Sequence, residues 1–424
     1  MFLKYFLLLL IYVIFLNIFS YSNTYNKFKK IRSVSDTDDD IFYRFKRKMY
    51  GDIHKFWISP IYFHIGLGLN STAILLALSE IQQHTCIEFV KAEQMTKQNC
   101  GISFVYGNQC SSTIGRISTK SWQNIILGGK NCLHKGGIQR EILHTLGMFN
   151  EENRYDRDNY VVFIKKNIDP RYIRKFMKYS CKILYTYNQP YDYGSLMHSG
   201  AYAYSYNGQK TLWPRDNLYG STIGSNDMIS FIDFKTLNLH YCKNRCKNKL
   251  ICLNEGYQDP SNCNRCKCIH GFTGIRCENV LFDQPSCKYI LIEAKQKAQT
   301  LKILGIKNCL YHIFTHKGKR ISMFVDNMNL YPNEKTVCRN ENSVEIKYYK
   351  NKGVSGARFC LKDNAITIAS HDHHIMIHYH SSMISNYVSI KFKAVEKSYF
   401  QRQCIRNAFA SKSFFKKRGY NLMV

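Results

Sequence analysis

Acidic residues are scarce in this sequence, and so are long apolar runs. Its 424 residues include 30 aspartates and glutamates against 60 lysines and arginines, which leaves a formal net charge of +30 at pH 7. The basic residues are spread along the chain instead of forming one patch, so we expect no nucleic-acid partner. Attraction to acidic glycans or anionic surfaces stays open. Beyond residue 19 no apolar stretch approaches the ~20 residues of a membrane span, so we expect no stable membrane insertion.

One apolar run is present, from Tyr5 to Phe19, and it follows a single lysine. The small-x-small sequence Ser20-Tyr21-Ser22 comes next, which completes the pattern of a secretory signal peptide over residues 1–22. An uncleaved membrane anchor is the alternative. A signal peptide predicts a secreted, extracellular protein, and the 17 cysteines fit that compartment because disulfides persist outside the cell.

The polar stretch 23–47 contains the acidic cluster Asp38-Asp39-Asp40 and ends in Arg44-Phe45-Lys46-Arg47. An R-x-K-R tetrapeptide resembles a proprotein-convertase cleavage site. We therefore predict that residues 23–47 are a propeptide and that the mature chain starts at Lys48, with an ordinary basic linker as the alternative. A chain of this length exceeds what one core supports, so two or three domains are expected.

Residues 48–242 form the longest stretch that no strong linker or domain-boundary sequence interrupts. Its patterns predict two helices and two strands, over 70–83, 88–90, 102–106 and about 137–149. We expect the side chain of Ser71 or Thr72 to cap the first helix. Asn70 opens the sequence Asn-Ser-Thr, a candidate N-glycosylation site of a kind that also arises by chance.

The second expected helix carries the motif that points to chemistry, Arg140-Glu141-Ile142-Leu143-His144-Thr145-Leu146-Gly147-Met148-Phe149-Asn150-Glu151. In the zinc-protease pattern H-E-x-x-H-x-x-G-x-x-H, the glutamate, the second histidine and the glycine are matched here. Positions 140 and 144 lie one helical turn apart on one face, which is the spacing that lets two ligands hold one zinc ion. Gly147 allows the sharp turn that returns position 150 to the site.

Three further features agree with this motif. Glu151 begins the sequence E-x-x-R-x-D-R-D-x-Y, and residues 190–198, Pro-Tyr-Asp-Tyr-Gly-Ser-Leu-Met-His, look like a methionine turn around Met197. Cysteines 86, 110, 132 and 242 stand where the astacin family places its bridges. Residues 48–242 therefore resemble an astacin domain, the mark of secreted zinc endopeptidases with two lobes around a cleft that this helix crosses. The resemblance implies the disulfides Cys86–Cys242 and Cys110–Cys132.

The ligand positions depart from the family pattern. Arg140 stands at the first, Asn150 at the third, and Ser199 where the family has a tyrosine after the methionine turn, which leaves His144 alone. Catalytic zinc takes three protein ligands and a water, and a guanidinium keeps its positive charge. We therefore expect zinc to be bound weakly or not at all. Glu141, the family's general base, then faces ordinary water, so peptidase activity is expected to be lost or very weak.

Two other histidines are close in sequence, but neither is expected to replace a ligand. His198 belongs to the methionine turn, and His134 lies before the helix in a Gly-rich connection. We expect Glu141 and His144 to be relics of the site, with the Glu141 carboxylate paired to Arg140.

Cysteines become dense after position 242, which excludes a hydrophobic core there and predicts a small disulfide-stapled module. The ending Cys268-Ile-His-Gly-Phe-Thr-Gly-Ile-Arg-Cys277 matches C-x-x-G-[FY]-x-G-x-x-C, so residues 243–279 resemble an EGF-like module. That resemblance implies three disulfides, Cys246–Cys263, Cys252–Cys266 and Cys268–Cys277. A different three-bridge arrangement stays open, since six cysteines allow many connectivities.

Alternating apolar and polar residues in the part that follows predict an all-β sandwich. Its cysteines resemble the two bridges of a CUB domain over residues 287–395, which implies the pairs Cys287–Cys309 and Cys338–Cys360. Calcium is not expected, because the residues that follow the third cysteine offer only Glu341 and Glu345 as carboxylates.

The stretch 371–380, His-Asp-His-His-Ile-Met-Ile-His-Tyr-His, is rich in histidine. As a strand it places His374, His378 and His380 on one face and turns Ile375 and Ile377 toward the core. We expect an exposed polar face, with a zinc or copper site as the less favoured alternative.

The sequence thus predicts an α+β protein with a two-lobed metzincin-like protease domain, an EGF-like module, a CUB-like sandwich and a basic tail over 396–424. Three cysteines remain, of which Cys100 and Cys181 are a candidate extra bridge and Cys404 is free or intermolecular. The predicted function is non-catalytic binding of extracellular proteins or peptides. The alternatives are an active zinc metalloendopeptidase with Glu141 as general base and a basic protein that adheres to anionic surfaces.

Overall fold

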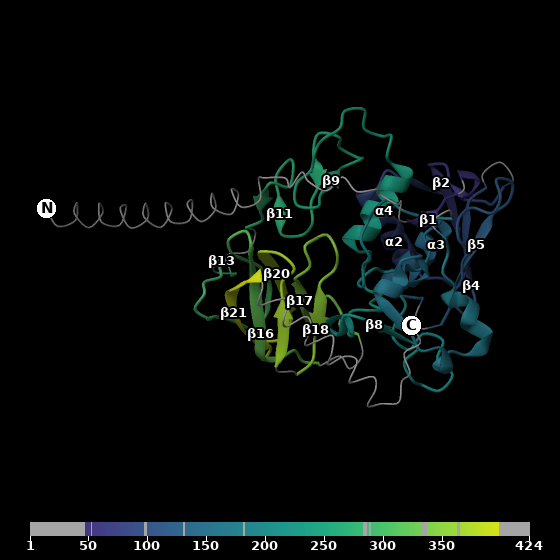
Figure 1. Ribbon diagram of the computed structural model, residues 1–424. Coiled ribbons are helices and arrows are strands. Elements are labelled where there is room, and N and C mark those ends of the chain that lie inside the picture. Colours follow the sequence, from purple (N-terminus) through teal and green to yellow (C-terminus); the bar gives the residue numbers. More distant parts are fainter. Residues whose placement is uncertain are drawn as a thin grey trace.

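The computed structural model describes residues 47–397, apart from 52, 97–99, 130–131, 181–182, 283–285, 288–289, 333–336 and 363–364. The predicted signal peptide, nearly all of the predicted propeptide and basic tail, Cys181 and Cys404 lie outside these residues. Figure 1 shows residues 47–242 on the right, a β-sandwich on the left, and the disulfide-rich segment (residues 243–280) above and between them. No helix in the described part is long and apolar enough to cross a membrane.

The N-terminal lobe is built on a four-stranded parallel sheet in the order β3-β2-β4-β5. Its elements are β2 Ile61–Ile65, α2 Ser71–His84, β3 Phe89–Lys91, β4 Ile102–Tyr106, β5 Gln123–Leu127 and α3 Lys135–Thr145, after a short 3₁₀ helix at Ile53–Lys55. Side chains of helices and sheet meet in one buried cluster that includes Ile74, Phe104 and Ile142. Burying each such side chain contributes about 1.5–3 kcal/mol, which fixes α3 against the sheet.

Helix α2 begins one residue after Asn70, whose side chain caps it. The Asn70 Oδ1 accepts a hydrogen bond from the backbone N–H of Ala73 at 3.1 Å and so satisfies a donor that the first turn leaves free. Ser71 and Thr72 lie within the first turn instead, so the predicted cap is wrong by one residue. Asn70, the candidate glycosylation residue, is exposed.

The C-terminal lobe (residues 146–242) has little regular structure. Its strands and its α-helix are β6 Val161–Phe163, β7 Leu184–Thr186, β8 Leu212–Pro214 and α4 Phe231–Tyr241. Short 3₁₀ helices connect them at Glu151–Asn153, Arg157–Asn159, Lys165–Asn167, Pro170–Phe176 and Asn217–Tyr219. The first described strand, β1 Arg47–Tyr50, pairs antiparallel with β7, so the start of the described chain is built into this lobe.

Seven disulfides join described cysteines other than Cys100, and they are the pairs that the resemblances implied. They are Cys86–Cys242, Cys110–Cys132, Cys246–Cys263, Cys252–Cys266, Cys268–Cys277, Cys287–Cys309 and Cys338–Cys360. Three of them cross-link the disulfide-rich segment. Its regular structure consists of two pairs of two-residue strands, β9 Tyr257–Gln258 with β10 Cys266–Lys267 and β11 Phe272–Thr273 with β12 Asn279–Val280.

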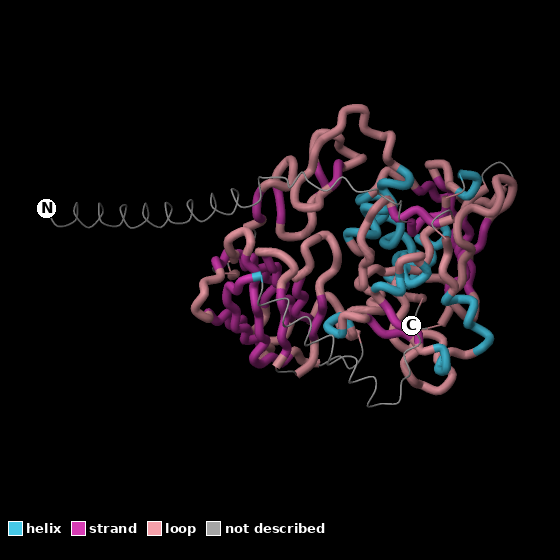
Figure 2. Tube along the Cα trace, viewed as in Figure 1, coloured by secondary structure: helices cyan, strands magenta, loops and turns pink. Residues whose placement is uncertain are grey.

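The last part is a sandwich of a five-stranded sheet, β13-β15-β20-β17-β18, and a four-stranded sheet, β14-β21-β16-β19. Its strands are β13 Leu291–Glu293, β14 Gln299–Leu304, β15 Lys307–Phe314, β16 Lys319–Asn329, β17 Ser343–Lys347, β18 Ala357–Phe359, β19 Ile366–Ala369, β20 His374–Ser381 and β21 Tyr387–Glu396. Figure 2 shows that the helices gather in residues 47–242, whereas the sandwich is made of strands. Ile375 and Ile377 are fully buried, as predicted.

The sandwich packs directly on the C-terminal lobe, and the two share one hydrophobic core. The shared cluster contains Tyr191, Tyr193 and Tyr219 from the lobe with Val344, Ile346 and Tyr348 from the sandwich. Polar contacts surround it: the Asp192 carboxylate accepts hydrogen bonds from the backbone N–H of Ser355 at 3.0 Å and its hydroxyl at 3.3 Å. Because Asp192 belongs to the methionine turn, the sandwich contacts a segment next to the candidate site.

The outer face of β20 is covered by the disulfide-rich segment. The ring of His270 lies 5.0 Å from that of His378, and the ring of Phe272 lies 5.1 Å from that of His312. His374 is fully buried, with its Nε2 3.1 Å from the Nδ1 of His312. The expected exposed polar face is therefore wrong, because a neighbouring module occupies it.

Acid is expected to loosen this contact through His378. Burial lowers the pKa of His378 to about 4; the charge of His270 adds to the decrease, Glu345 opposes it, and His380 and Lys347 again lower it. A histidine with a lowered folded-state pKa contributes stability above its ordinary pKa of about 6.5 and loses it as the pH falls from there toward 4. We expect the loss to reach roughly 1–3 kcal/mol.

Hydrogen exchange of the β20 amides, compared at pH 7 and pH 4.5 after correction for intrinsic rates, measures this effect. His378→Gln is expected to remove most of the pH dependence, whereas His316→Gln, at a histidine whose side chain is 63% exposed, is expected to leave it in place. Equal protection of β20 at both pH values in the unmodified protein would contradict the expectation.

Candidate functional site

Helix α3 carries Arg140, Glu141 and His144 to the junction of the two lobes. His134 caps its start, because the His134 Nδ1 accepts a hydrogen bond from the backbone N–H of Gly137 at 3.2 Å. That capping contact gives His134 a structural purpose away from the motif. The helix approaches residue 226 so closely that a Cβ at Gly136 would lie 1.8 Å from the Asn226 carbonyl oxygen.

The helix ends at Thr145, earlier than the predicted end near 149, and the chain then reverses. Gly147 adopts a φ of +94°, which favours glycine over any residue with a Cβ. Its carbonyl accepts a hydrogen bond from the backbone N–H of Tyr50 at 2.9 Å, and Met148 bridges to Met49. This reversal brings Asn150 back beside Arg140, as the motif spacing predicted.

Arg140 and Asn150 bind each other at the positions of the first and third ligands. The Arg140 Nη2 donates to the Asn150 Oδ1 at 2.7 Å, and its Nη1 donates to the carbonyl oxygens of Leu196 at 2.5 Å and His198 at 3.5 Å. The guanidinium therefore joins the helix, the reversed segment and the methionine turn. The predicted pairing of Arg140 with Glu141 is wrong, since the guanidinium turns toward Asn150.

Glu141 has its own partner on another segment. The hydroxyl of Ser112 donates to the Glu141 Oε2 at 2.6 Å. Burial raises the pKa of the Glu141 carboxyl, while the Ser112 hydrogen bond and the charges of Arg140 and Lys175 oppose the increase. The carboxylate that the family uses as general base is thus buried and held by a serine.

His144 is partly buried beside the same guanidinium. Its Nδ1 lies 2.8 Å from the Met148 carbonyl oxygen, and burial together with the charge of Arg140 lowers its pKa to about 3. The imidazole is therefore neutral near pH 7, with its Nε2 as the one nitrogen left to bind a metal. No group of three or more His, Cys, Asp or Glu side chains in the described residues is placed to hold a metal ion. One imidazole beside a fixed positive charge does not fit a catalytic zinc ion.

The methionine turn lies under this site. Met197 is fully buried in the N-terminal core cluster, and the His198 Nε2 lies 2.8 Å from the Tyr191 hydroxyl. Ser199 is 8% exposed, and its backbone N–H donates to the Glu152 Oε2 at 3.1 Å. Buried contacts keep the turn in place. The side chain of Ser199 is much shorter than the tyrosine that the family has at this position.

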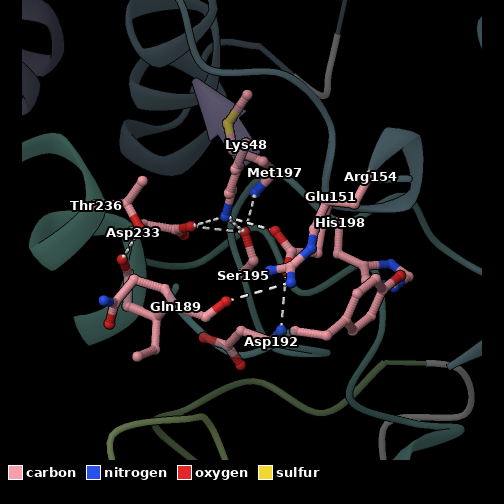
Figure 3. A network of polar contacts seen from close by, with 12 residues as sticks. Lys48, Glu151, Arg154, Gln189, Asp192, Ser195, Met197, His198, Asp233 and Thr236 are labelled. Carbon is pink, nitrogen blue, oxygen red and sulfur yellow. Dashed lines mark hydrogen bonds and ion pairs between the residues drawn. The ribbon is translucent and has the colours of Figure 1, made fainter. Parts of the chain in front are cut away.

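A buried ion network holds the methionine turn against β1 and α4 (Figure 3). The Lys48 ammonium lies 2.7 Å from the Glu151 carboxylate, contacts Asp233 and donates to the Ser195 hydroxyl at 2.9 Å. Asp233 also accepts from the backbone N–H of Leu196 at 2.8 Å. Burial alone lowers the pKa of Lys48, but Asp233 and Glu151 outweigh it and the pKa is raised, so the ammonium stays charged.

Arg154 extends this network on the other side of Glu151. Its guanidinium donates to the Glu151 Oε1 at 2.9 Å and to both Asp156 carboxylate oxygens at 2.9 Å. It also reaches the carbonyl oxygens of Pro190 at 3.0 Å and Gln189 at 3.2 Å, at the start of the methionine turn. One carboxylate, Glu151, thus links the segment after α3 to both ends of the turn.

No pattern in the sequence predicts the residues that complete the site. Ser112 contacts Glu141 from 29 positions earlier in the chain, and Lys48 contacts Glu151 from 103 positions earlier. Local sequence patterns cannot predict contacts over such separations. In the sequence, Lys48 stands out only as the residue after a candidate cleavage site. Lysine usually faces the solvent. Its presence in the first described strand therefore gives no indication that it is buried.

A helix with the pattern E-x-x-H-x-x-G, a methionine turn beneath it and two lobes define a metzincin-like protease fold. Residues 50–242 match the astacin peptidase family, and residues 287–394 match the CUB domain. The chain therefore contains an astacin-family domain followed by a CUB domain.

Two nematode proteins illustrate the relationship. The chain is 34% identical over 333 residues to zinc metalloproteinase nas-34 of Caenorhabditis elegans, covering 77% of this chain and 54% of that protein. It is 36% identical over 319 residues to zinc metalloproteinase nas-23 of the same nematode, covering 72% and 57%. The chain thus spans about half the length of these curated relatives.

Among solved structures, high choriolytic enzyme 1, a hatching enzyme zinc-protease from the medaka fish Oryzias latipes, is similar to this chain. The sequence identity is 30% and the TM-score 0.40, and the match covers 44% of this chain and 94% of that one.

Replacing Lys48 by methionine tests the buried network. Lys48→Met leaves the Glu151 and Asp233 carboxylates buried without their ammonium partner, which is expected to lower the free energy of unfolding by about 3–5 kcal/mol. Urea unfolding followed by circular dichroism measures the loss. Lys391→Met is the matched control, because its pair with Asp326 is half-exposed and is expected to contribute at most about 1 kcal/mol. Equal losses in the two variants would show that the network is not a stabilising feature.

Proposed function

We propose that this chain is a non-catalytic astacin-family protein that binds extracellular proteins or peptides through its cleft. The observation that supports the proposal is the 2.7 Å hydrogen bond between Arg140 and Asn150. It occupies the first and third ligand positions with side chains that bind each other. A metal would have to displace a guanidinium that also holds two carbonyl oxygens of the methionine turn.

The chemistry of the family explains why this bond matters. When zinc is bound, it lowers the pKa of its water from about 15.7 to about 7 and so supplies a nucleophile at neutral pH. In this chain Arg140 places a permanent positive charge beside His144, which disfavours a second cation. Glu141 could take a proton from a water, but nothing here makes that water acidic.

The alternative is an active zinc metalloendopeptidase that cleaves extracellular proteins, with Glu141 as general base. The names of the nematode relatives favour it, since both are zinc metalloproteinases. It requires that Arg140 swing away and that His144 bind zinc with fewer protein ligands than catalytic sites normally use.

Extracellular localisation is part of the proposal. The astacin and CUB domains are typical of extracellular proteins, and seven disulfides fit an oxidising compartment. The partners we propose are extracellular proteins or peptides, and acidic glycans are a further candidate given the net charge of +30.

Metal analysis of the purified full-length protein tests the proposal directly. We expect well under a tenth of an equivalent of tightly bound zinc after dialysis, and no cleavage of gelatin or casein above a buffer control. Stoichiometric zinc together with chelator-sensitive cleavage would overturn the proposal and establish the alternative.

Restoring the ligands tests whether the scaffold itself is intact. The variant Arg140→His, Asn150→His and Ser199→Tyr is expected to bind about one zinc per chain, because α3 and Gly147 already bring positions 140, 144 and 150 together. A matched control with alanine at the same three positions is expected to stay zinc-free. If the histidine variant folds and still binds no zinc, the loss of metal has a cause other than these side chains.

A further inference from the structure

A pocket of about 430 Å³ lies where the disulfide-rich segment meets the end of α4. Its walls combine apolar side chains with two lysines, and they include Leu239, Leu250, Tyr257, Pro260, Lys243 and Lys249. We propose that this pocket and the loops beside it bind an anionic phospholipid surface, with a lipid phosphate at the two lysines and the loops at the membrane interface. Binding there does not depend on whether the candidate site holds zinc.

The walls of the pocket are held in place by bonds within the chain. The side-chain amide of Asn238 donates to the Tyr257 hydroxyl at 3.1 Å, which joins α4 to β9. The chain between these two elements is cross-linked by three disulfides, Cys86–Cys242, Cys246–Cys263 and Cys252–Cys266. A site that is already ordered loses little conformational entropy when it binds.

The backbone fixes the charge of Lys249 at the pocket. Its ammonium donates to the carbonyl oxygens of Lys243 at 3.1 Å and Cys246 at 3.5 Å. An ammonium has three N–H donors, and these two contacts leave one for an anion. The Lys243 side chain is exposed and lines the same pocket. Two ammonium groups next to apolar walls favour an anionic group that is joined to an apolar body.

The chain around the pocket is strongly basic. Residues 243–249, Lys-Asn-Arg-Cys-Lys-Asn-Lys, contain four cations, and all four side chains are exposed. None of the four forms an ion pair with a carboxylate of the described residues. Together they outweigh the partial charge of about −0.5 at the carboxyl end of α4, which alone would disfavour an anion. An anionic surface is therefore attracted to this segment.

The three carboxylates of the disulfide-rich segment are engaged elsewhere. Asp259 is fully buried and pairs with Arg265. The Glu255 Oε2 accepts a hydrogen bond from the side-chain amide of Asn351 at 2.9 Å, and the Glu278 Oε2 accepts one from a nearby backbone N–H at 2.7 Å. The positive charge of residues 243–249 is thus left for a partner.

Exposed apolar side chains stand beside this basic run. Ile251 is 72% exposed, Ile275 62% and Leu253 40%. The Leu253 N–H donates to the Arg276 carbonyl at 2.7 Å and the Arg276 Nε donates to the Ile251 carbonyl at 2.8 Å, so the two stretches are held together. Figure 1 shows loops of the disulfide-rich segment projecting beyond α4 and β9 at the top of the molecule. Apolar side chains among cations are characteristic of surfaces that bind at a membrane interface.

The two features together favour a lipid surface over a sulfated glycan. Sulfates would satisfy Lys243 and Lys249 as well as lipid phosphates do, but a polysaccharide offers no apolar phase to Ile251 and Ile275. A bilayer offers both, because its acyl chains begin directly beneath its phosphates. The contact we propose is peripheral, with side chains that reach the headgroup region and no segment that crosses the bilayer.

Vesicle binding by the full-length protein tests the proposal. Vesicles of phosphatidylcholine with about 30% phosphatidylserine are compared with vesicles of phosphatidylcholine alone by cosedimentation. We expect at least tenfold tighter binding to the anionic vesicles. Inorganic phosphate, added at the concentration of the lipid phosphate, is expected to leave this binding unchanged, because it offers nothing to the apolar loops.

Charge variants separate this site from the general positive charge of the chain. Lys243→Glu with Lys249→Glu is expected to weaken binding to the anionic vesicles at least tenfold. The matched control, Lys302→Glu with Lys393→Glu, makes the same charge change on exposed positions of the sandwich and is expected to change binding less than twofold. Equal unfolding midpoints show that each variant is folded.

The apolar loops have a test of their own. Ile251→Ser with Ile275→Ser is expected to weaken binding at least tenfold, whereas Ile306→Ser with Ile384→Ser, at sandwich positions that are 65% and 84% exposed, is expected to leave it unchanged. Lipids with brominated acyl chains are expected to quench the added fluorescence of Ile251→Trp and not that of Ile384→Trp, because residue 251 reaches the bilayer.

Four results would overturn the inference. They are equal binding to the two kinds of vesicle, equal losses in the site and control variants, displacement of the vesicles by inorganic phosphate, or binding of heparin alone that the lysine variant abolishes. Zinc content and casein cleavage, measured on the same preparation, test the proposed function separately. A zinc-loaded, cleaving protein that binds the vesicles through this site would refute only the proposed function.

Discussion

The ion network around Lys48 is the constraint on which the site depends. A single ammonium, buried with Glu151 and Asp233, connects the first described strand, the segment after α3, the methionine turn and α4. Charges buried in this way are costly unless each finds a partner, so the geometry that pairs them is enforced. Glu151 directly follows Asn150, and the network therefore fixes where position 150 returns to the helix, whatever side chain stands there.

This independence lets the chain keep the geometry of the reversal with an arginine at position 140 and an asparagine at position 150. Gly147 sets the reversal, Glu151 anchors the chain beyond it, and Arg140 and Asn150 fill the space between with a hydrogen bond of their own. The guanidinium also binds two carbonyl oxygens of the methionine turn. Arg140 and Asn150 thus form a cross-link between the lobes.

Much of this arrangement was predictable from the sequence, and the exceptions have physical reasons. Spacing and periodicity located α3, the reversal at Gly147 and the sandwich, whereas the pairs of cysteines were implied by the family resemblances. The hydrogen bond between Arg140 and Asn150 was not predicted, because Glu141 is the carboxylate next to Arg140 in the sequence and was the expected partner of its guanidinium. The burial of His374 was missed because a strand pattern reports which residues share a face but not what covers that face. Neither Ser112 nor Lys48 had a local signal, as their partners are distant in the chain.

The core shared by the C-terminal lobe and the sandwich bears on how such a chain is inherited. Three tyrosines of the lobe belong to one buried cluster with residues that lie more than 100 positions later, across the disulfide-rich segment. A gene fragment that ended after residue 242 would encode a lobe with a bare aromatic face next to its methionine turn. The sandwich is therefore no detachable accessory that evolution could exchange freely, because each half must be inherited with the surface that matches it.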